Sequence, residues 1–332
     1  MELARELLDF LEVVEQRIGA ALVDGDAGPG VKGDTLMEAA RHLVMGGGGK
    51  RARPMLVRFF GDAVGAPSER LIEAAVSAEL IHSASLLHDD VVDGGMFRRS
   101  RPTVNARWGN IVAVMSGDLI LSTTLLRLVQ LDGRLIQSAL SVVSEMTRAA
   151  IAEVEARGVM ALPMPQLRYI AEGKTGSLFG WCGQAAAILA NNPEAVQRFD
   201  GFGRHLGVAF QIADDIRDIL GTDVGKPQYA DLQSRTPSMP ILMALAKDES
   251  LRRKLRDAWA FSSIPPERAQ EIGAGIIATG AVEMALEEMN TEIEAALDRL
   301  GNFSDSEGGR ELVSWAHQLS AGITEQVRSK VA

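Results

Sequence analysis

The chain has 332 residues, and its 44 acidic side chains outnumber its 34 Lys and Arg side chains, for a formal net charge of −10. This charge disfavours nucleic acid as a partner, since nucleic-acid binding uses a basic patch, and an anionic ligand would need metal ions or clustered cations. The single cysteine, Cys182, excludes a disulfide framework within one chain. We expect it to be a buried thiol in a reducing compartment, and we predict a cytoplasmic protein.

Helical periodicity runs through almost the whole sequence and strand-type alternation is nearly absent, so we predict an all-α fold. Short Gly- and Pro-rich breaks separate roughly ten to fourteen helices, and none is long enough for an interdomain linker. We therefore expect one domain over residues 1–332, with a motif core at 41–245 and surrounding helices at 246–332. The start lacks the features of a signal peptide, and no run of about 18 uncharged apolar residues predicts a transmembrane helix.

The first motif is a glycine run at residues 46–49, which is followed by Lys50 and Arg53. Glycine lets backbone N–H groups approach an anion closely, and the two cations would add charge at the start of the next helix. The motif is not a P-loop, because it lacks the G-x-x-x-x-G-K-[ST] pattern and a preceding strand. The alternative is a flexible basic loop.

A D-D-V-V-D motif runs from Asp89 to Asp93, so its first and last carboxylates share one helix face. Like charges at this spacing weaken a helix unless a partner compensates, and Mg²⁺ prefers such oxygen ligands. His82 lies two turns earlier on the same stripe and is either a phosphate ligand or a core residue. Arg98 and Arg99 follow the motif and suit bidentate phosphate contacts, although alone they would be surface charge.

Lys174 and Thr175 stand between Gly173 and Gly176, which predicts a break in a helix with a cation and a hydroxyl at the break. Kinks of this kind turn backbone groups toward a ligand. The alternative is a loosely packed turn without function.

A second motif of the same spacing, D-D-I-R-D, runs from Asp214 to Asp218. Gln211 lies one turn before it, and Lys226 follows in a Gly-Lys-Pro turn, where it is a candidate cation or plain surface charge. Because two such motifs occur on apolar helices, we expect a cage for a diphosphate and several Mg²⁺ ions rather than two solvated acidic faces.

The motifs G-G-K-R-A-R-P, L-L-H-D-D-V-V-D followed by R-R, K-T-G-S-L-F, F-Q-I-A-D-D-I-R-D and G-K-P occur in this order. Together they resemble the trans-isoprenyl diphosphate synthases. The resemblance implies an all-α bundle around a deep central cavity, usually as a homodimer. It also implies head-to-tail condensation of isopentenyl diphosphate onto an allylic diphosphate, with three Mg²⁺ ions, or Mn²⁺ as the alternative, and a product for delivery to the membrane.

The resemblance also implies roles for individual residues. The direct metal ligands would be Asp89, Asp93 and Asp214, while direct or water-mediated contacts would come from Asp218, Asp90 and Asp215. The isopentenyl diphosphate site would consist of Lys50, Arg53, His82 and Arg99. The allylic diphosphate site would consist of Arg98, Lys174, Thr175, Gln211 and Lys226. The residues expected to act in catalysis are Asp89, Asp93, Asp214 and Lys174.

The chain departs from the family pattern in three places. Gly94 and Gly95 stand where the family usually has acidic or polar residues, and Ser100 stands where it has glycine. Arg235 takes the place of a lysine in the lid over the allylic diphosphate, and it keeps the charge but not the shape.

Small residues before the first aspartate motif favour a long product. Ser85 and Ala84 lie four and five residues before Asp89, and Ile81 is one turn deeper. Four residues of helix rise about 6 Å, roughly one isoprene unit. We therefore expect about six to ten units, with octaprenyl as the central estimate. The alternative is a floor built elsewhere, for example by Leu or Met side chains near residues 115–126, which would give farnesyl or geranylgeranyl diphosphate.

Two rival functions are weighed against this one. A terpene cyclase also uses D-D-x-x-D, but its second motif differs and it lacks the glycine-Lys-Arg loop. A non-catalytic subunit of a two-component synthase generally loses the aspartate motifs, and this chain has both.

Overall fold

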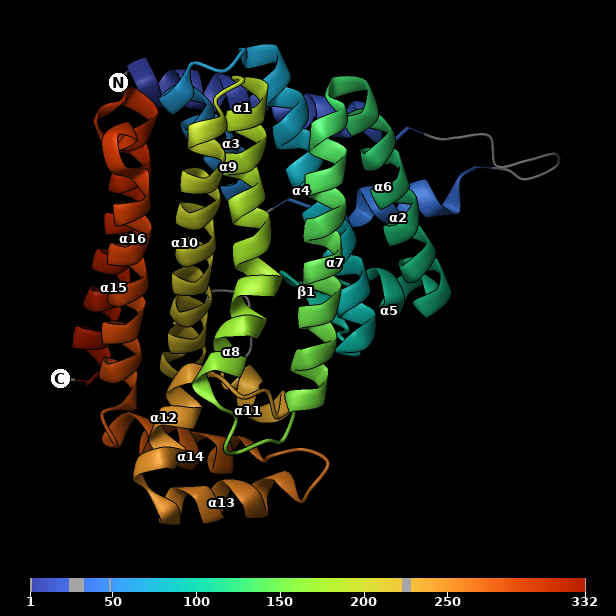
Figure 1. The fold of residues 1–332 in the computed structure, drawn as a ribbon. Helices are drawn as coiled ribbons and strands as arrows, with labels where there is room; N and C mark the ends of the chain where they lie inside the picture. The colour runs from blue at the N-terminus through green and yellow to red at the C-terminus, as the bar shows by residue number, and fades with distance from the viewer. Residues whose placement is uncertain (1, 24–32, 48, 223–227, 332) are drawn as a thin grey trace. The chain divides into compact units, whose positions relative to one another are not determined.

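The computed structural model describes residues 2–23, 33–47, 49–222 and 228–331 (Figure 1). Within these residues the chain forms sixteen α-helices, a π-helical turn (η1, Glu172–Gly176), a 3₁₀ helix (η2, Gly301–Asp305) and one small hairpin. The prediction of an all-α protein is confirmed. The expected number of helices was too low, because five-residue helices such as α5 (Val104–Trp108) and α11 (Ala230–Ser234) are too short to give a periodic pattern.

The described residues pack into two compact units, each built from separate stretches of sequence. The first unit takes the chain up to Val143 together with residues 178–200 and 302–312, and the second takes residues 144–177, 201–301 and 313 onward. The expectation of one domain over residues 1–332 stays a prediction.

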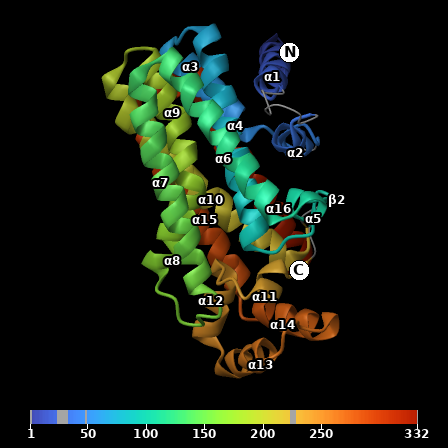
Figure 2. The ribbon, with the colours of Figure 1, turned by 90° about the vertical axis from the view of Figure 1, so that its right-hand side faces the viewer.

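The long helix α4 (Ser68–Val92) is the core of the first unit. From Leu71 to Ala84 all but two residues are buried, which is typical of a helix that is apolar on every side. It packs along α6 (Figure 2) and also contacts α3 and α1. Other helices that lie wholly or partly in this unit include α1 (Glu2–Ala21), α2 (Thr35–Val44), α3 (Ala52–Val64), α5, α6 (Asn110–Leu131), α7 (Gly133–Ala156), α9 (Ser177–Leu189) and α10 (Pro193–Leu220).

A two-stranded hairpin follows α4 in the first unit. Strand β1 (Phe97–Arg98) pairs antiparallel with β2 (Arg101–Pro102). The two residues between them, Arg99 and Ser100, have φ angles of 50° and 61°. Positive φ at both central positions is the signature of a type I′ turn, which is favoured in two-residue hairpins because it matches the twist of the strands. Residues other than Gly, Asn and Asp are uncommon in this left-handed conformation.

The second unit contains the end of α7 and the chain from α8 onward, apart from the stretches that belong to the first unit. Its helix α12 packs on α13, α14 and α15. Local sequence explains several helix starts, since proline opens α8, α12 and α14, and the Asp248 carboxylate caps α13 by accepting bonds from the N–H groups of Ser250 and Leu251. The helices not yet given bounds are α8 (Met164–Ala171), α12 (Met239–Lys247), α13 (Glu249–Trp259), α14 (Pro266–Ala278), α15 (Ala281–Leu300) and α16 (Glu307–Val331).

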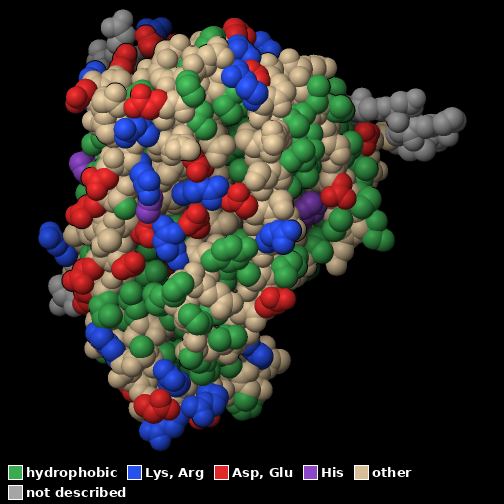
Figure 3. Space-filling view, viewed as in Figure 1, with side chains coloured by type: hydrophobic (Ala, Val, Ile, Leu, Met, Phe, Trp, Pro, Cys, Tyr) green, Lys and Arg blue, Asp and Glu red, His purple; other side chains and the backbone are tan. Residues whose placement is uncertain are grey.

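Helix α6 buries one face against α4 and exposes apolar side chains on the other. Ile111, Leu126 and Val129 are 80%, 67% and 58% exposed. Figure 3 shows hydrophobic side chains at the surface along the edge where α6 lies in Figure 1. Within the described residues α6 alone is long and apolar enough to cross a membrane by length and composition, with 33% of its most apolar window buried. This is weak evidence for a span, because core helices of globular proteins pass the same test.

Candidate functional site

The first aspartate motif lies at the C-terminal end of α4. Asp93 caps the helix, and its N–H donates to the carbonyl of Asp89 at 2.8 Å. The helical geometry therefore continues through the motif, and Asp89 and Asp93 lie one turn apart as predicted. Asp90 lies between them, is buried, and has only 4% of its surface exposed.

Asp90 is held by the hairpin. Arg98 donates from Nη2 to Oδ1 at 2.8 Å and from Nε to Oδ1 and Oδ2 at 3.1 and 3.2 Å. This bidentate pair fixes the hairpin to the end of α4, because a buried carboxylate needs a charged partner. The sequence predicted Arg98 as a clamp for the allylic diphosphate, and the structure places its guanidinium on Asp90.

Several cations surround His82 in the first unit. Burial and the nearby charges of Arg53, Arg98 and Arg99 hold the pKa of His82 well below its usual value of 6.5. His82 is therefore neutral at neutral pH and can both accept and donate a hydrogen bond. The structure thus brings together Arg53, His82 and Arg99 of the predicted isopentenyl diphosphate site, with Arg98 close by. Lys50, the fourth predicted residue, is exposed just before α3.

Arg53 is buried close to His82, and further guanidinium groups lie beside the glycine run. Burial lowers the pKa of Arg53, whose guanidinium lies 5.3 Å from the centre of the Phe179 ring. A side chain at Gly49 would lie 3.2 Å from the guanidinium of Arg51 and 3.3 Å from that of Arg99. The absence of a side chain at Gly49 therefore leaves room for two guanidinium groups beside the loop.

Sequence analysis missed Arg51 and Glu79. Arg51 has a φ of 48° and donates to the carboxylates of Glu15 in α1 and Glu79 in α4. Burial lowers the pKa of Arg51, but these two ion pairs outweigh it and raise the pKa above its usual value. Glu79 is 6% exposed, and its position in an apolar stretch of α4 was a signal that it needed a buried partner.

The second aspartate motif lies near the end of α10, in the second unit. Asp214 accepts a bond from Arg217 at 2.8 Å. Asp218 accepts from the backbone N–H groups of Ala230 and Asp231 at 2.8 and 3.2 Å, so it caps the start of α11.

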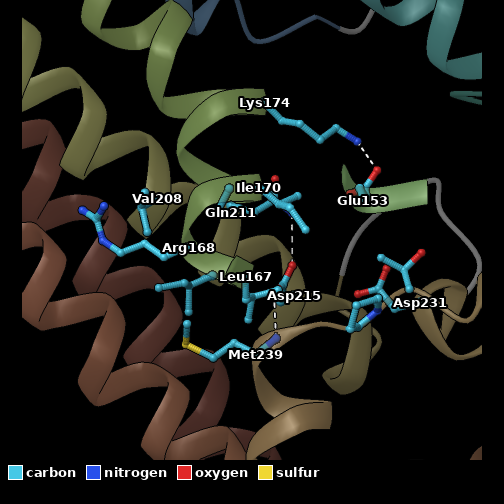
Figure 4. A pocket seen from close by; sticks show the side chains of 14 residues that line it. Glu153, Leu167, Arg168, Ile170, Lys174, Val208, Gln211, Asp215, Asp231 and Met239 are labelled. Carbon is cyan, nitrogen blue, oxygen red and sulfur yellow. Dashed lines mark hydrogen bonds and ion pairs between the residues drawn. The ribbon is translucent and has the colours of Figure 1, made fainter. Parts of the chain in front are cut away.

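A hydrogen-bond chain connects the break at Thr175 with this motif. Thr175 Oγ1 donates to Gln211 Oε1 at 3.3 Å. Gln211 Nε2 donates to Asp215 Oδ1 at 3.1 Å, and the Met239 N–H donates to Asp215 Oδ2 at 3.0 Å (Figure 4). Burial raises the pKa of Asp215 to about 7, and the charges of Asp214 and Asp218 add to the rise. These groups were predicted from sequence, and the structure brings them together.

Lys174 lies at the rim of a pocket in the second unit and forms an ion pair with Glu153 of α7 (Figure 4). Sequence analysis did not single out Glu153, because nothing local distinguishes it from other helical glutamates. The polar residues Gln211, Asp215 and Asp231 lie on the same pocket, and its apolar lining comes from Leu167, Ile170, Ala171, Val208, Ile212, Pro237 and Met239. Lys226, the remaining predicted cation, lies outside the described residues.

Arg235, expected in the lid over the allylic diphosphate, is oriented elsewhere. It has a φ of 60°, and its guanidinium donates to the Phe261 carbonyl at 2.9 Å. Its own carbonyl accepts from the Gly158 N–H at 2.8 Å. Arg235 therefore ties three loops together in the second unit, while its neighbours Thr236 and Pro237 line the pocket.

The aspartate motifs fit a metal that takes only part of its ligands from protein. Within the part of the chain that the structure describes, no three Asp, Glu, His or Cys side chains group closely enough to hold a metal ion. Each motif instead offers two carboxylates one turn apart. This donor set matches Mg²⁺, which commonly binds one or two carboxylates and completes its shell with phosphate oxygens and water.

The residues proposed for chain length lie on α4 before the first motif. Ile81 and Ala84 are buried, and Ser85 is half-buried with its hydroxyl donating to the His82 carbonyl at 2.8 Å. Their burial agrees with an interior position on α4.

Comparisons with known proteins identify relatives of this chain. The sequence profile of the polyprenyl synthetase family matches residues 34–272. A (2E,6E)-farnesyl diphosphate synthase of Mycobacterium tuberculosis is 38% identical over 232 residues, which are 67% of this chain and 64% of that protein. Heptaprenyl diphosphate synthase component 2 of Geobacillus stearothermophilus is 34% identical over 89% of this chain and 90% of that protein.

The fold is similar to solved structures. A decaprenyl diphosphate synthase from Rhodobacter capsulatus has a TM-score of 0.86 and 26% identity, with 97% of this chain and 98% of that chain covered. The match spans slightly less than two thirds of the length of the mycobacterial farnesyl diphosphate synthase.

Proposed function

This chain belongs to the polyprenyl synthetase family, and from this premise we propose that it is a transferase that condenses isopentenyl diphosphate head-to-tail onto an allylic diphosphate. The observation that supports the proposal most strongly is the pair of D-D-x-x-D motifs, each accompanied by cations within its own unit. In the first unit the cations are Arg53, Arg98 and Arg99. In the second they are Arg217, which donates to Asp214, and Lys174, which lines the same pocket as Asp215.

The proposed substrates divide between these groups. Isopentenyl diphosphate is assigned to Lys50, Arg53, His82 and Arg99. The allylic diphosphate is assigned to Arg98, Lys174, Thr175, Gln211 and Lys226. The arginines provide planar donors that match phosphate oxygens, and the neutral imidazole of His82 can donate one hydrogen bond without repelling the guanidinium groups around it.

The proposed metal ligands are Asp89, Asp93, Asp214 and Asp218, with three Mg²⁺ ions, or Mn²⁺ as the alternative. Mg²⁺, when bound there, supplies positive charge to the departing diphosphate. The chain's own contribution is to fix the carboxylates on helix ends and to exclude water from the carbon atoms. The apolar lining of the pocket by Val208, Ile212 and Met239 suits the second task, since water would quench an allylic cation.

For chain length we propose a long product, with octaprenyl diphosphate as the central expectation. The buried, small Ala84 and the absence of an aromatic side chain at Ile81 and Ser85 support an open tunnel. The relatives themselves range from farnesyl to nonaprenyl diphosphate synthases, so they leave the length open. The alternative is a short product, farnesyl or geranylgeranyl diphosphate.

We also propose that the enzyme is a cytoplasmic homodimer that delivers its product to a membrane. A second copy would cover the exposed apolar side chains of α6, for which Ile111 and Leu126 are the largest exposed contributors. Cys182, the single cysteine, is buried, and burial raises the pKa of its thiol to about 12, which agrees with an inert thiol in a reducing compartment.

The test is incubation of the purified full chain with Mg²⁺, isopentenyl diphosphate and either geranyl or farnesyl diphosphate, followed by chromatography of the products. Longer diphosphates support the proposal. Hydrocarbons would indicate a terpene cyclase, and no product would indicate a non-catalytic subunit. Products that stop at farnesyl or geranylgeranyl diphosphate would reject the open tunnel while leaving the reaction itself intact.

A further inference from the structure

Lys174 and Thr175 lie in a π-helical turn rather than an ordinary helical kink. In η1 the N–H of Ser177 donates to the carbonyl of Glu172, five residues earlier, and the Ser177 hydroxyl donates to the Gly173 carbonyl at 2.6 Å. A π turn inserts one extra residue into an α-helix and persists only where its surroundings enforce it, often at functional sites. Two features of the surrounding helices hold this turn in place, close packing at glycines and a network of ion pairs.

Close packing at glycines is the first of these features. A side chain carbon at Gly176 would lie 2.7 Å from the carbonyl oxygen of Arg204, and one at Gly207 would lie 2.4 Å from the Cα of Gly176. On the other side, a side chain at Gly173 would lie 2.5 Å from the Cβ of Ala149. The turn is thus pressed directly between α7 and α10, which leaves no room for other residues at these positions.

The network of ion pairs is the second feature. Glu172, the first residue of the turn, forms ion pairs with Arg168 one turn earlier and with Arg204 of α10, the latter at 3.3 Å. Arg204 also pairs with Glu145 of α7 at 2.8 Å. Arg168 is held in turn by Glu292 of α15 at 2.8 Å. The carboxylate of Glu172 is therefore shared by two guanidinium groups that are each anchored to another helix.

Glu292, the carboxylate that pairs with Arg168, is buried and charged. Glu292 is 7% exposed and also contacts His205 Nδ1 at 2.7 Å. Burial raises the pKa of Glu292, but hydrogen bonds from His205 and Arg168 outweigh it, so the pKa lies below its usual value. Figure 4 shows Arg168 pointing away from Lys174 and Glu153. The ion pairs of Arg168 thus lie on the side of the turn opposite the ion pair of Lys174 with Glu153.

We propose that Glu172 is a positioning residue, whose ion pairs with Arg168 and Arg204 hold the π turn so that Lys174 and Thr175 are presented to the allylic diphosphate. The inference rests on the proposed function for the identity of the ligand. Without the extra residue of the π turn, side chains within and after it would rotate by up to about 100° around the helix axis, one residue of an α-helix. Lys174 would then leave Glu153, and Thr175 would leave Gln211.

The test compares two isosteric variants that remove ion pairs from the same arginine. Glu172→Gln weakens the pairs within the turn, whereas Glu145→Gln removes a pair with Arg204 that does not involve the turn. We expect Glu172→Gln to raise the KM for the allylic diphosphate by about tenfold or more while the KM for isopentenyl diphosphate stays within twofold, as for a change of about 1.4 kcal/mol confined to one substrate. Glu145→Gln should leave both KM values near those of the parent.

A second measurement does not depend on activity. Amide hydrogen exchange in the ligand-free proteins should increase over residues 174–177 in Glu172→Gln and stay as in the parent in Glu145→Gln. If Glu172→Gln folds poorly, Arg204→Lys weakens the same pair and should give the same exchange pattern. Unchanged exchange in the turn, or equal KM changes for both substrates, would overturn the proposal. An inactive parent would instead overturn the proposed function, and the exchange result would still decide whether Glu172 holds the turn.

Discussion

His82 allows a direct test of the cationic cluster in the first unit. Burial and the charges of Arg53, Arg98 and Arg99 keep the folded-state pKa of His82 well below 6.5, whereas in the unfolded chain the imidazole should titrate near 6.5. Below this pH the unfolded chain therefore binds more protons than the folded one, and the folded state loses stability as the pH falls. Above about pH 6.5 both states are neutral at this position and the contribution is constant. His82→Gln replaces the imidazole by a neutral side chain that cannot be protonated.

The magnitude follows from proton linkage. One proton bound by the unfolded chain alone gives a slope of about 1.4 kcal/mol per pH unit, so at one pH unit below 6.5 the parent should have lost about 1.4 kcal/mol relative to the variant. Part of the His82 side chain is still accessible, so this slope is an upper limit. All other titrating groups are common to both proteins and cancel in the difference.

The assay is urea unfolding of the parent and of His82→Gln at a series of values between about pH 5 and 8, the range in which histidine titrates. We expect the difference in unfolding free energy to be flat above about pH 6.5 and to move in favour of the variant below it. A difference that is flat over the whole range would show that His82 titrates alike in both states and would refute the cationic environment assigned to it.

Four further outcomes are expected. Asp89→Ala should lower kcat by several orders of magnitude, and activity within about tenfold of the parent, 1.4 kcal/mol of barrier, would contradict its role as a metal ligand. Lys50→Ala should raise KM mainly for isopentenyl diphosphate, and an effect limited to the allylic substrate would reverse the assignment. Ala84→Phe should shorten the products seen by chromatography if the tunnel is open, and unchanged lengths would place the tunnel wall elsewhere. Ser100→Gly should raise the free energy of unfolding by about 0.5 kcal/mol, because glycine relieves the positive φ but adds entropy to the unfolded chain; a lower urea midpoint at unchanged m would contradict the strain.

The helical fold was predictable from sequence because its signals are local. The amphipathic periodicity of a long helix such as α7 can be recognised in the sequence. The spacing of the aspartates then places the first and last carboxylate of each motif on one helix face. The hairpin after α4 was not predictable, because each strand has two residues and its turn uses Arg99 and Ser100 instead of the Asn-Gly pair that marks type I′ turns. Tertiary contacts, among them the pair of Arg98 with Asp90, hold this hairpin in place.

Site residues could be predicted from the sequence only where the residues that act together lie on the same helix or loop. The glycines around Lys174 indicated a break in a helix, and the structure has a π turn there. Glu79 could have been noticed as a glutamate in an apolar stretch, but its partner Arg51 could not be identified from the sequence. Glu153 and Glu172 could not be found in this way, because each has a partner far away in the sequence and ordinary glutamates on helices are usually solvated. Only the fold reveals which of them are paired.

These partners bear on how an acidic protein could bind anions at the proposed diphosphate sites. Arg98 is held by Asp90 and Lys174 by Glu153, so these cations are ordered before any ligand arrives and are not left buried without a partner. A diphosphate that binds them must compete with these carboxylates, and the electrostatic gain from the cations alone is correspondingly smaller. The net charge of −10 on the whole chain further reduces the electrostatic gain from binding an anion. Anion binding should therefore be weak without a divalent metal and strong with it, and a diphosphate that binds equally well in the presence of a chelator would contradict this reasoning.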